Sequence, residues 1–143
     1  MSLIVDNNVA AEFFCGATPD LQPLKRAVLN AVLCLYYGGE LRREYFRSAK
    51  VRQAVKILDQ AGRAKAVSDA AVDEKTTEVK PKCVSDDPHV IALAIVFGAR
   101  LLCSRDQALH QDFGNPQWIN SPRGYVYQNA SHEHLIRRCC QGR

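Results

Sequence analysis

Short apolar runs and longer stretches with helical spacing follow one another along this chain. The apolar runs are continuous rather than alternating, which is typical of strands covered on both faces of a parallel sheet. For the second run, residues 31–37, the alternative is a helix that continues from Leu21. The predicted strands are residues 3–5, 31–37, 66–67 and 100–104, with a short edge strand or hairpin near 124–127.

Between these runs, apolar residues recur with a period of about 3.6 residues, which indicates amphipathic helices. The first helix should end at Gly16, and the second should have Thr18 as its N-cap and Pro19 in its first turn. Strands that alternate with helices predict βαβ units, and therefore an α/β fold with a mostly parallel central sheet. The other predicted helices are residues 40–61, 69–79, 88–97 and 132–139.

Composition narrows the class of protein. The 143 residues are 47% hydrophobic and 24% charged, as in soluble globular proteins, and we expect one domain over 1–143. The longest apolar stretch, 90–97, is too short to cross a membrane. The N-terminus shows no leader pattern, so we expect a cytoplasmic protein whose six cysteines are free thiols.

Histidines and cysteines near the C-terminus could suggest a zinc site. Their spacing fits no structural zinc pattern well, so we favour a helical or frayed tail. The residues concerned are His132, His134, Cys139 and Cys140.

Carboxylates lie beside three of the apolar runs. Asp6 follows the first strand, Asp106 closely follows the strand at 100–104, and Asp87 opens the helix at 88–97. Taken singly, each is explained as a turn residue or a helix cap. Taken together, they would gather at the carboxyl edge of the sheet, where ligands bind in open α/β folds. They would repel one another there unless a cation lay between them.

Mg²⁺ or Mn²⁺ suits such a site, because these ions take hard oxygen ligands and promote phosphodiester hydrolysis. If four acids belong to the site, the 19 Lys and Arg outnumber the remaining 11 acids by eight, which favours a polyanionic partner such as nucleic acid. The alternative is that the basic residues between 42 and 56 form an ordinary solvated helix face. No Walker A loop, G-x-S-x-G or H-E-x-x-H motif offers another chemistry.

Four short motifs, in this order, resemble the PIN domain family: LIVDNNV, LRREY, DPHVIALA and LLCSRD, beginning at residues 3, 41, 87 and 101. The resemblance covers about 3–113 and leaves about 114–143 as a C-terminal extension. It implies a three-layer α/β/α sandwich with a mostly parallel sheet, a Mg²⁺ or Mn²⁺ site, and hydrolysis of single-stranded RNA. It also admits a toxin of the VapC type, with an antitoxin and a second copy of the chain as partners.

The family pattern also assigns residues. Glu40, one turn before Glu44 on the same helix face, is an alternative to it, and Asp86 is the neighbour of Asp87. The Gly38-Gly39 turn favours Glu44, and Pro88 sets the register at Asp87. By resemblance, the catalytic and metal-site acids are Asp6, Glu44, Asp87 and Asp106, supported by hydrogen bonds from Asn8 and Ser104.

Three further polar residues lie near these acids. Because residues two apart on a helix do not share a face, His89 should point away from Asp87 and act as a structural or supporting residue. His110 and Asp112 follow Asp106 closely and could contact substrate. Two other functions remain open: a catalytically inactive PIN-like module that binds RNA or protein, and a receiver-type signalling domain.

Overall fold

A five-stranded, fully parallel sheet forms the centre of the computed structural model, which describes residues 2–16, 18–120 and 123–136. The strand order is β3-β2-β1-β4-β5, and the predicted α/β class is confirmed. In β1, Leu3, Ile4 and Val5 have no exposed surface, as expected for a strand covered on both faces. The strands are β1 (Ser2–Val5), β2 (Cys34–Tyr37), β3 (Ala64–Ala66), β4 (Leu101–Cys103) and β5 (Tyr125–Tyr127).

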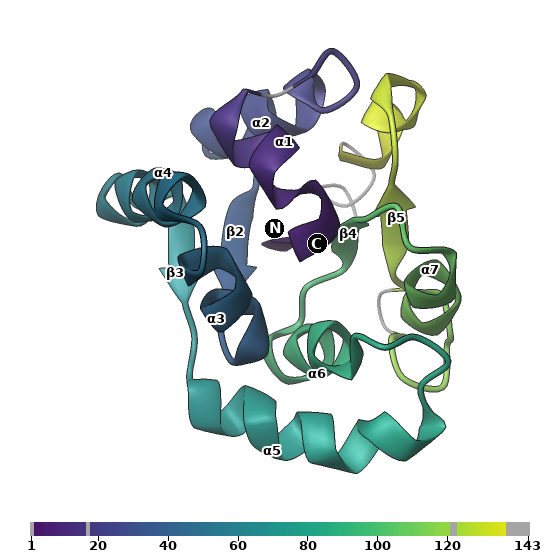
Figure 1. Ribbon diagram of the computed structural model, residues 1–143. Coiled ribbons are helices and arrows are strands. Elements are labelled where there is room, and N and C mark those ends of the chain that lie inside the picture. Colours follow the sequence, from purple (N-terminus) through teal and green to yellow (C-terminus); the bar gives the residue numbers. More distant parts are fainter. Residues whose placement is uncertain (1, 17, 121–122, 137–143) are drawn as a thin grey trace.

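Helices cover both faces of the sheet, which gives three layers (Figure 1). On one side lie α1 (Ala10–Cys15), α2 (Gln22–Leu29) and α4 (Ala49–Gln60). On the other lie α5 (Asp69–Val79), α6 (Pro88–Phe97) and α7 (Gln107–Phe113). Because α6 lies between the sheet and α5, every residue from 88 to 94 is buried. The remaining α-helix, α3 (Glu40–Phe46), contacts both α4 and α6.

The sheet has a topological switch point between β1 and β4. The chain adds β2 and β3 on one side of β1, then returns to add β4 and β5 on the other. Val5 pairs with Cys103, so β1 and β4 end at the same level. Ligands of open α/β sheets bind in the crevice beyond such strand ends. The flavodoxin-like order of receiver domains is 2-1-3-4-5, so the receiver alternative is wrong.

Two predicted helix boundaries are wrong. The helix expected from Thr18 begins only at Gln22, because the Thr18 hydroxyl donates to Glu12 Oε1 at 2.9 Å instead of capping a helix. The helix expected over 40–61 is divided into α3 and α4. Ser48 lies between them with extended backbone, and its hydroxyl accepts from Val51 N at 3.3 Å to cap α4.

The strand predictions hold with small corrections. The second strand begins at Cys34 rather than at residue 31, because Ala31 has a φ of 62° and turns the chain. The last strand, β5, pairs with β4 in parallel and is therefore an edge strand and not a hairpin. Residues 133–136 are helical, and the remainder of the helix predicted at 132–139 lies outside the described residues.

Three 3₁₀ turns complete the fold, at Asn7–Val9, Lys80–Lys82 and Ala130–His132. The four cysteines within the described ranges, Cys15, Cys34, Cys83 and Cys103, are free thiols. None of the helices in the described part of the chain has the length and apolar character needed to cross a membrane.

Candidate metal centre

Asp6 lies directly beyond β1, at the switch point. Its main-chain N–H donates to the carbonyl oxygen of Cys103 at 2.9 Å, which ties it to the end of β4. Its Oδ1 accepts from Asn7 N and its Oδ2 from the Ser104 hydroxyl, both at 2.8 Å. The residue is only 3% exposed. Burial raises the pKa of Asp6, and the two hydrogen bonds counteract that rise.

Ser104 connects two of the predicted acids. Besides donating to Asp6, its hydroxyl accepts from Asp106 N at 3.1 Å. Asp106 caps α7, since its Oδ1 accepts from Ala108 N at 3.0 Å and from Leu109 N at 3.3 Å. Ser104 thus hydrogen-bonds with both Asp6 and Asp106, and its supporting role in a metal site stays a prediction. The Asn8 side chain is exposed and makes no hydrogen bond within the described ranges, so its supporting role stays a prediction.

Glu44 is placed by the turn that precedes α3. Gly39 has a φ of 60° and a ψ of −139°, a conformation that only glycine adopts readily, and a Cβ there would lie 2.7 Å from Val72. At the other end of α3, the fully buried Tyr45 hydroxyl donates to the carbonyl oxygen of Val5. This contact fixes α3 against the end of β1. Glu44, the preceding residue, is therefore held close to Asp6, and its side chain is 17% exposed.

Asp87 follows a loop that a buried acid holds in place. Asp112 is 2% exposed, and its two carboxylate oxygens accept from Val84 N at 3.0 Å and Ser85 N at 2.9 Å. The prediction that Asp112 contacts substrate is therefore wrong, because both its oxygens are occupied inside the protein. Asp87 is the N-cap of α6, but its side chain makes no capping hydrogen bond. Its carboxylate stays available to other partners.

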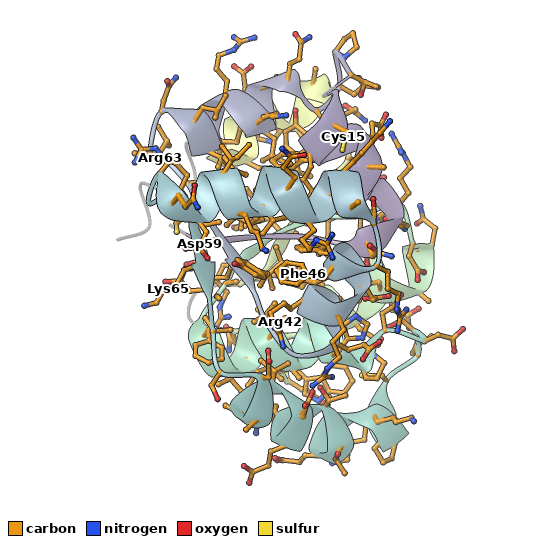
Figure 2. The ribbon with its side chains drawn as sticks, turned by 60° about the vertical axis from the view of Figure 1, so that its left-hand side comes forward. Cys15, Arg42, Phe46, Asp59, Arg63 and Lys65 are labelled. Carbon is orange, nitrogen blue, oxygen red and sulfur yellow. The ribbon has the colours of Figure 1, made fainter. Side chains whose placement is uncertain are left out.

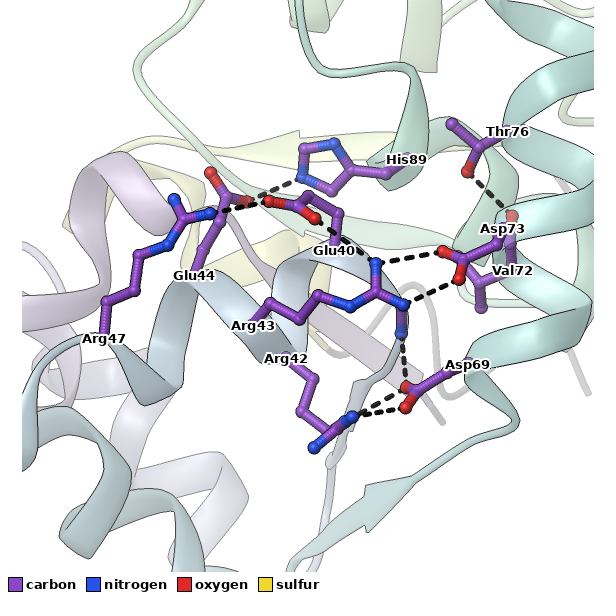
Figure 3. A network of polar contacts seen from close by, with 11 residues as sticks. Glu40, Arg42, Arg43, Glu44, Arg47, Asp69, Val72, Asp73, Thr76 and His89 are labelled. Carbon is purple, nitrogen blue, oxygen red and sulfur yellow. Dashed lines mark hydrogen bonds and ion pairs between the residues drawn. The ribbon is translucent and has the colours of Figure 1, made fainter.

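Among the described residues, possible ligand atoms converge at Glu44, Asp87 and His89, where one such atom from each residue lies within 4.8 Å of the others. His89 Nε2 lies 2.7 Å from Glu44 Oε1 (Figure 3). The prediction that His89 points away from Asp87 is wrong. Asp87 has a φ of −120° and a ψ of 56°, so it lies outside the helix, and the spacing rule for helical residues does not apply to the pair.

The pKa of Asp87 depends on the charges of the other three predicted acids. Burial, together with the negative charges of Asp6, Glu44 and Asp106, raises the pKa of Asp87 to about 6, and His89 acts in the opposite direction. In the same way, Glu44 raises the pKa of Asp6. Asp6 and Asp106 are not part of the tight group of ligand atoms around Glu44. They nevertheless lie close enough to act on Asp87 through their charges.

Glu40 lies in a different environment from Glu44. Its carboxylate pairs with Arg43 at 3.3 Å and Arg47 at 3.1 Å (Figure 3). Arg43 also forms a two-pronged pair with Asp73 of α5, at 2.7 and 3.2 Å. The carboxylate whose oxygen lies within 4.8 Å of ligand atoms of Asp87 and His89 is therefore that of Glu44.

Part of the basic stretch at 42–56 is neutralised within the protein. Arg42 is paired with Asp69, which also accepts from Gly39 N at 2.8 Å. The Arg42 guanidinium lies 5.6 Å from the centre of the Phe46 ring (Figure 2). Two of these arginines therefore hold α5 against α3. The exposed cations further along α4 are Lys50, Arg52 and Lys56.

The other histidines have structural partners. His110 is half-buried, and its Nε2 lies 2.6 Å from the carbonyl oxygen of Ser104, so it bridges α7 to the end of β4. In the C-terminal segment, His132 Nδ1 accepts from Gln128 N at 3.0 Å, and His134 Nδ1 lies 3.2 Å from the carbonyl oxygen of Ser131. Cys139 and Cys140, the other members of the zinc candidate, lie outside the described residues.

No protein-family model matches the sequence, and no curated protein matches it either. Among solved structures, the chain is similar to the crystal structure of VapBC2 from Rickettsia felis bound to a DNA fragment from their promoter. The TM-score is 0.46 and the sequence identity is 16%, over 90% of this chain and 99% of that chain. The interpretation of the site therefore depends on its own geometry.

Proposed function

We propose that this protein is a metal-dependent nuclease of the PIN type that hydrolyses phosphodiester bonds in single-stranded RNA. One observation carries the proposal: a ligand atom from each of Glu44, Asp87 and His89 lies within 4.8 Å of the others. Asp6 lies nearby at the junction of β1 and β4, and the charges of Asp6, Glu44 and Asp106 all act on Asp87. RNA as the substrate follows from the motif resemblance.

The donor set fits a divalent cation. Carboxylate oxygens are the ligands that Mg²⁺ and Mn²⁺ prefer, and a cation would offset the burial and the repulsion that together raise the pKa of Asp87. His89 Nε2 is engaged with Glu44 Oε1 at 2.7 Å, so this histidine would orient a ligand of the ion rather than serve as one. The residues that would hold the ion are Asp6, Glu44, Asp87 and Asp106. When bound, such an ion supplies charge neutralisation at the scissile phosphate and activation of a water nucleophile.

The surrounding residues of the chain keep these acids in position. Ser104 orients the Asp6 carboxylate, Tyr45 holds α3 at the end of β1, and Asp112 holds the loop before Asp87. His89 contacts Oε1 of Glu44 and does not contact Oε2, the other carboxylate oxygen. Preorganised acids of this kind lower the cost of assembling the site around a cation and a phosphate.

Cleavage of a labelled single-stranded RNA, with Mg²⁺, Mn²⁺ or a chelator, tests the proposal. We expect cleavage that needs the metal, and a loss of roughly 100-fold or more in Asp6→Asn and Glu44→Gln. Glu40→Gln is the matched control for Glu44→Gln, because it removes the same charge one turn earlier on the same helix. Asp86→Asn is the control for Asp87→Asn, because Asp86 is exposed and adjacent.

The control variants show whether a loss of cleavage comes from the proposed metal site or from the removal of any nearby negative charge. Equal losses in Glu40→Gln and Glu44→Gln would contradict the assignment of Glu44. Cleavage that survives in Asp6→Asn would contradict the whole site. RNA binding without cleavage at any metal concentration would identify the protein as the inactive PIN-like module. An antitoxin and a second copy of the chain are part of the same proposal, and the mass of the native complex tests them.

A further inference from the structure

A cavity of about 640 Å³ lies away from the acids, between α5, α6 and the segment that follows α7. Ile95 lines it, and this residue lies seven positions after Pro88, which is about 10 Å along α6 from the candidate metal centre. The volume lies within the usual range for small-molecule sites. The lining residues are Lys75, Glu78, Val79, Lys82, Ile95, Asn115, Gln117 and Trp118.

One wall of the cavity is aromatic and held in place. Trp118 is partly buried against the core, and the next residue, Ile119, is fully buried and anchors the segment. Trp118 N donates to the carbonyl oxygen of Asn115 at 3.1 Å, and Gln117 N donates to Asn115 Oδ1 at 3.0 Å. These contacts fix the turn that carries the indole. With Val79 and Ile95 as further apolar lining, the indole gives the cavity a surface for a flat ring.

The remaining lining residues are polar, and they include Lys82, a lysine without an acidic partner in the described part of the chain. Lys75 pairs with Glu78 at 3.1 Å, which leaves these two residues close to neutral together. Lys82 is exposed and forms no ion pair within residues 2–16, 18–120 and 123–136, so its ammonium group offers three donors to an anion. The Gln117 side chain is exposed at the same cavity and carries both a donor and an acceptor.

We propose that this cavity binds a nucleotide, with the base against Trp118 and the phosphate near Lys82. Stacking of a base on an aromatic side chain tolerates any base, and the carboxamides of Asn115 and Gln117 can hydrogen-bond to its edge. The nucleotide is either free or part of a single-stranded RNA. The RNA source depends on the proposed nuclease function, whereas the free nucleotide does not.

Trp118 is the only tryptophan of the chain, so its fluorescence reports on the cavity directly. The first experiment titrates AMP, and in a second arm a short oligoadenylate, into the protein in a chelator, so that no cleavage is involved. We expect saturable quenching by at least one of the two probes. Quenching by AMP identifies a site for free nucleotide, and quenching by the oligoadenylate alone identifies a site for the strand. Quenching by neither overturns the proposal.

Variants separate this cavity from the rest of the surface. Lys82→Ala should weaken binding of the active probe about fivefold, while Lys80→Ala should leave it unchanged. Lys80 lies in the same 3₁₀ turn but lines a different cavity, which makes it a matched control. Equal effects of the two substitutions would overturn the proposal, because they would indicate a general attraction between charges.

Two further variants complete the test. Trp118→Leu, measured by equilibrium dialysis of labelled probe because the fluorescence is lost, should weaken binding at least about fivefold. Circular dichroism checks that this variant folds, and unchanged binding by a folded Trp118→Leu contradicts the proposal. Asp87→Asn should bind the probe as the unmodified protein does. Loss of binding in Asp87→Asn would place the probe at the acids and overturn the second site, whether or not the protein cleaves RNA.

Discussion

Replacing Asp87 by Asn should stabilise the metal-free protein at neutral pH. The pKa of Asp87 rises from the ordinary value of 3.8 to about 6 in the folded state. A difference of roughly two units corresponds to about 3 kcal/mol. Because Asp87 is only partly buried, solvent screening reduces the expected effect to about 1–2 kcal/mol. Asn keeps the shape of the side chain and removes the charge that burial and the neighbouring acids disfavour.

The direction of this change in stability, and its dependence on pH, follow from proton linkage. The folded state binds the Asp87 proton more tightly than the unfolded state does, so this group favours folding below pH 3.8. That contribution is lost as the pH rises through about 6, and above it the ionised Asp87 opposes folding of the metal-free protein. The advantage of Asp87→Asn should therefore be present at neutral pH and absent below pH 3.8.

Urea unfolding in a chelator measures this difference. The free energies of unfolding of the unmodified protein, Asp87→Asn and the control Asp86→Asn are compared at neutral pH and below the ordinary Asp pKa. Only Asp87→Asn should gain stability at neutral pH. Excess Mg²⁺ should then stabilise the unmodified protein more than the variant, because the ion binds only the folded site. A variant that is equally or less stable at neutral pH would refute the raised pKa of Asp87 in the folded protein.

Two further predictions concern residues that hold the acids in place. In Ser104→Ala, the loss of the hydrogen bond that lowers the Asp6 pKa should raise that pKa further, so the acid limb of the pH–rate profile should move to higher pH; an unmoved limb would contradict it. In Asp112→Asn, one of the two loop hydrogen bonds should be lost, which should cost about 1–3 kcal/mol of unfolding free energy. Urea unfolding measures this, and Glu74→Gln, an exposed residue of α5, should have no effect.

The sequence carried strong signals for the sheet and for the helix that follows Asp87. Continuous apolar runs gave the parallel strands, because only strands covered on both faces are apolar throughout. Pro88 and Gly98 bounded α6 at the residues where the structure begins and ends it. Asp87 was marked by its place before this helix and Glu44 by the motif resemblance, and the structure brings the two together. Their role as metal ligands stays a prediction.

What the sequence could not supply depends on contacts between distant residues. His89 was misplaced because a helical spacing rule was applied to Asp87, a cap residue with non-helical backbone. Asp112 looked like a substrate residue, yet its partners Val84 and Ser85 lie more than twenty-five positions earlier in the chain. The break at Ser48 did have a local signal, since serine is a common N-cap, but apolar spacing on both sides concealed it.

Binding of Mn²⁺, followed by the loss of the free-ion signal in electron paramagnetic resonance, tests the central claim most directly. The unmodified protein should bind Mn²⁺ with saturation. Asp6→Asn, Glu44→Gln and Asp87→Asn should each weaken binding at least about tenfold, while Glu40→Gln and Asp86→Asn should leave it unchanged. If the unmodified protein bound no Mn²⁺, or if the three variants bound it as tightly as the two controls do, these carboxylates would not form a metal site.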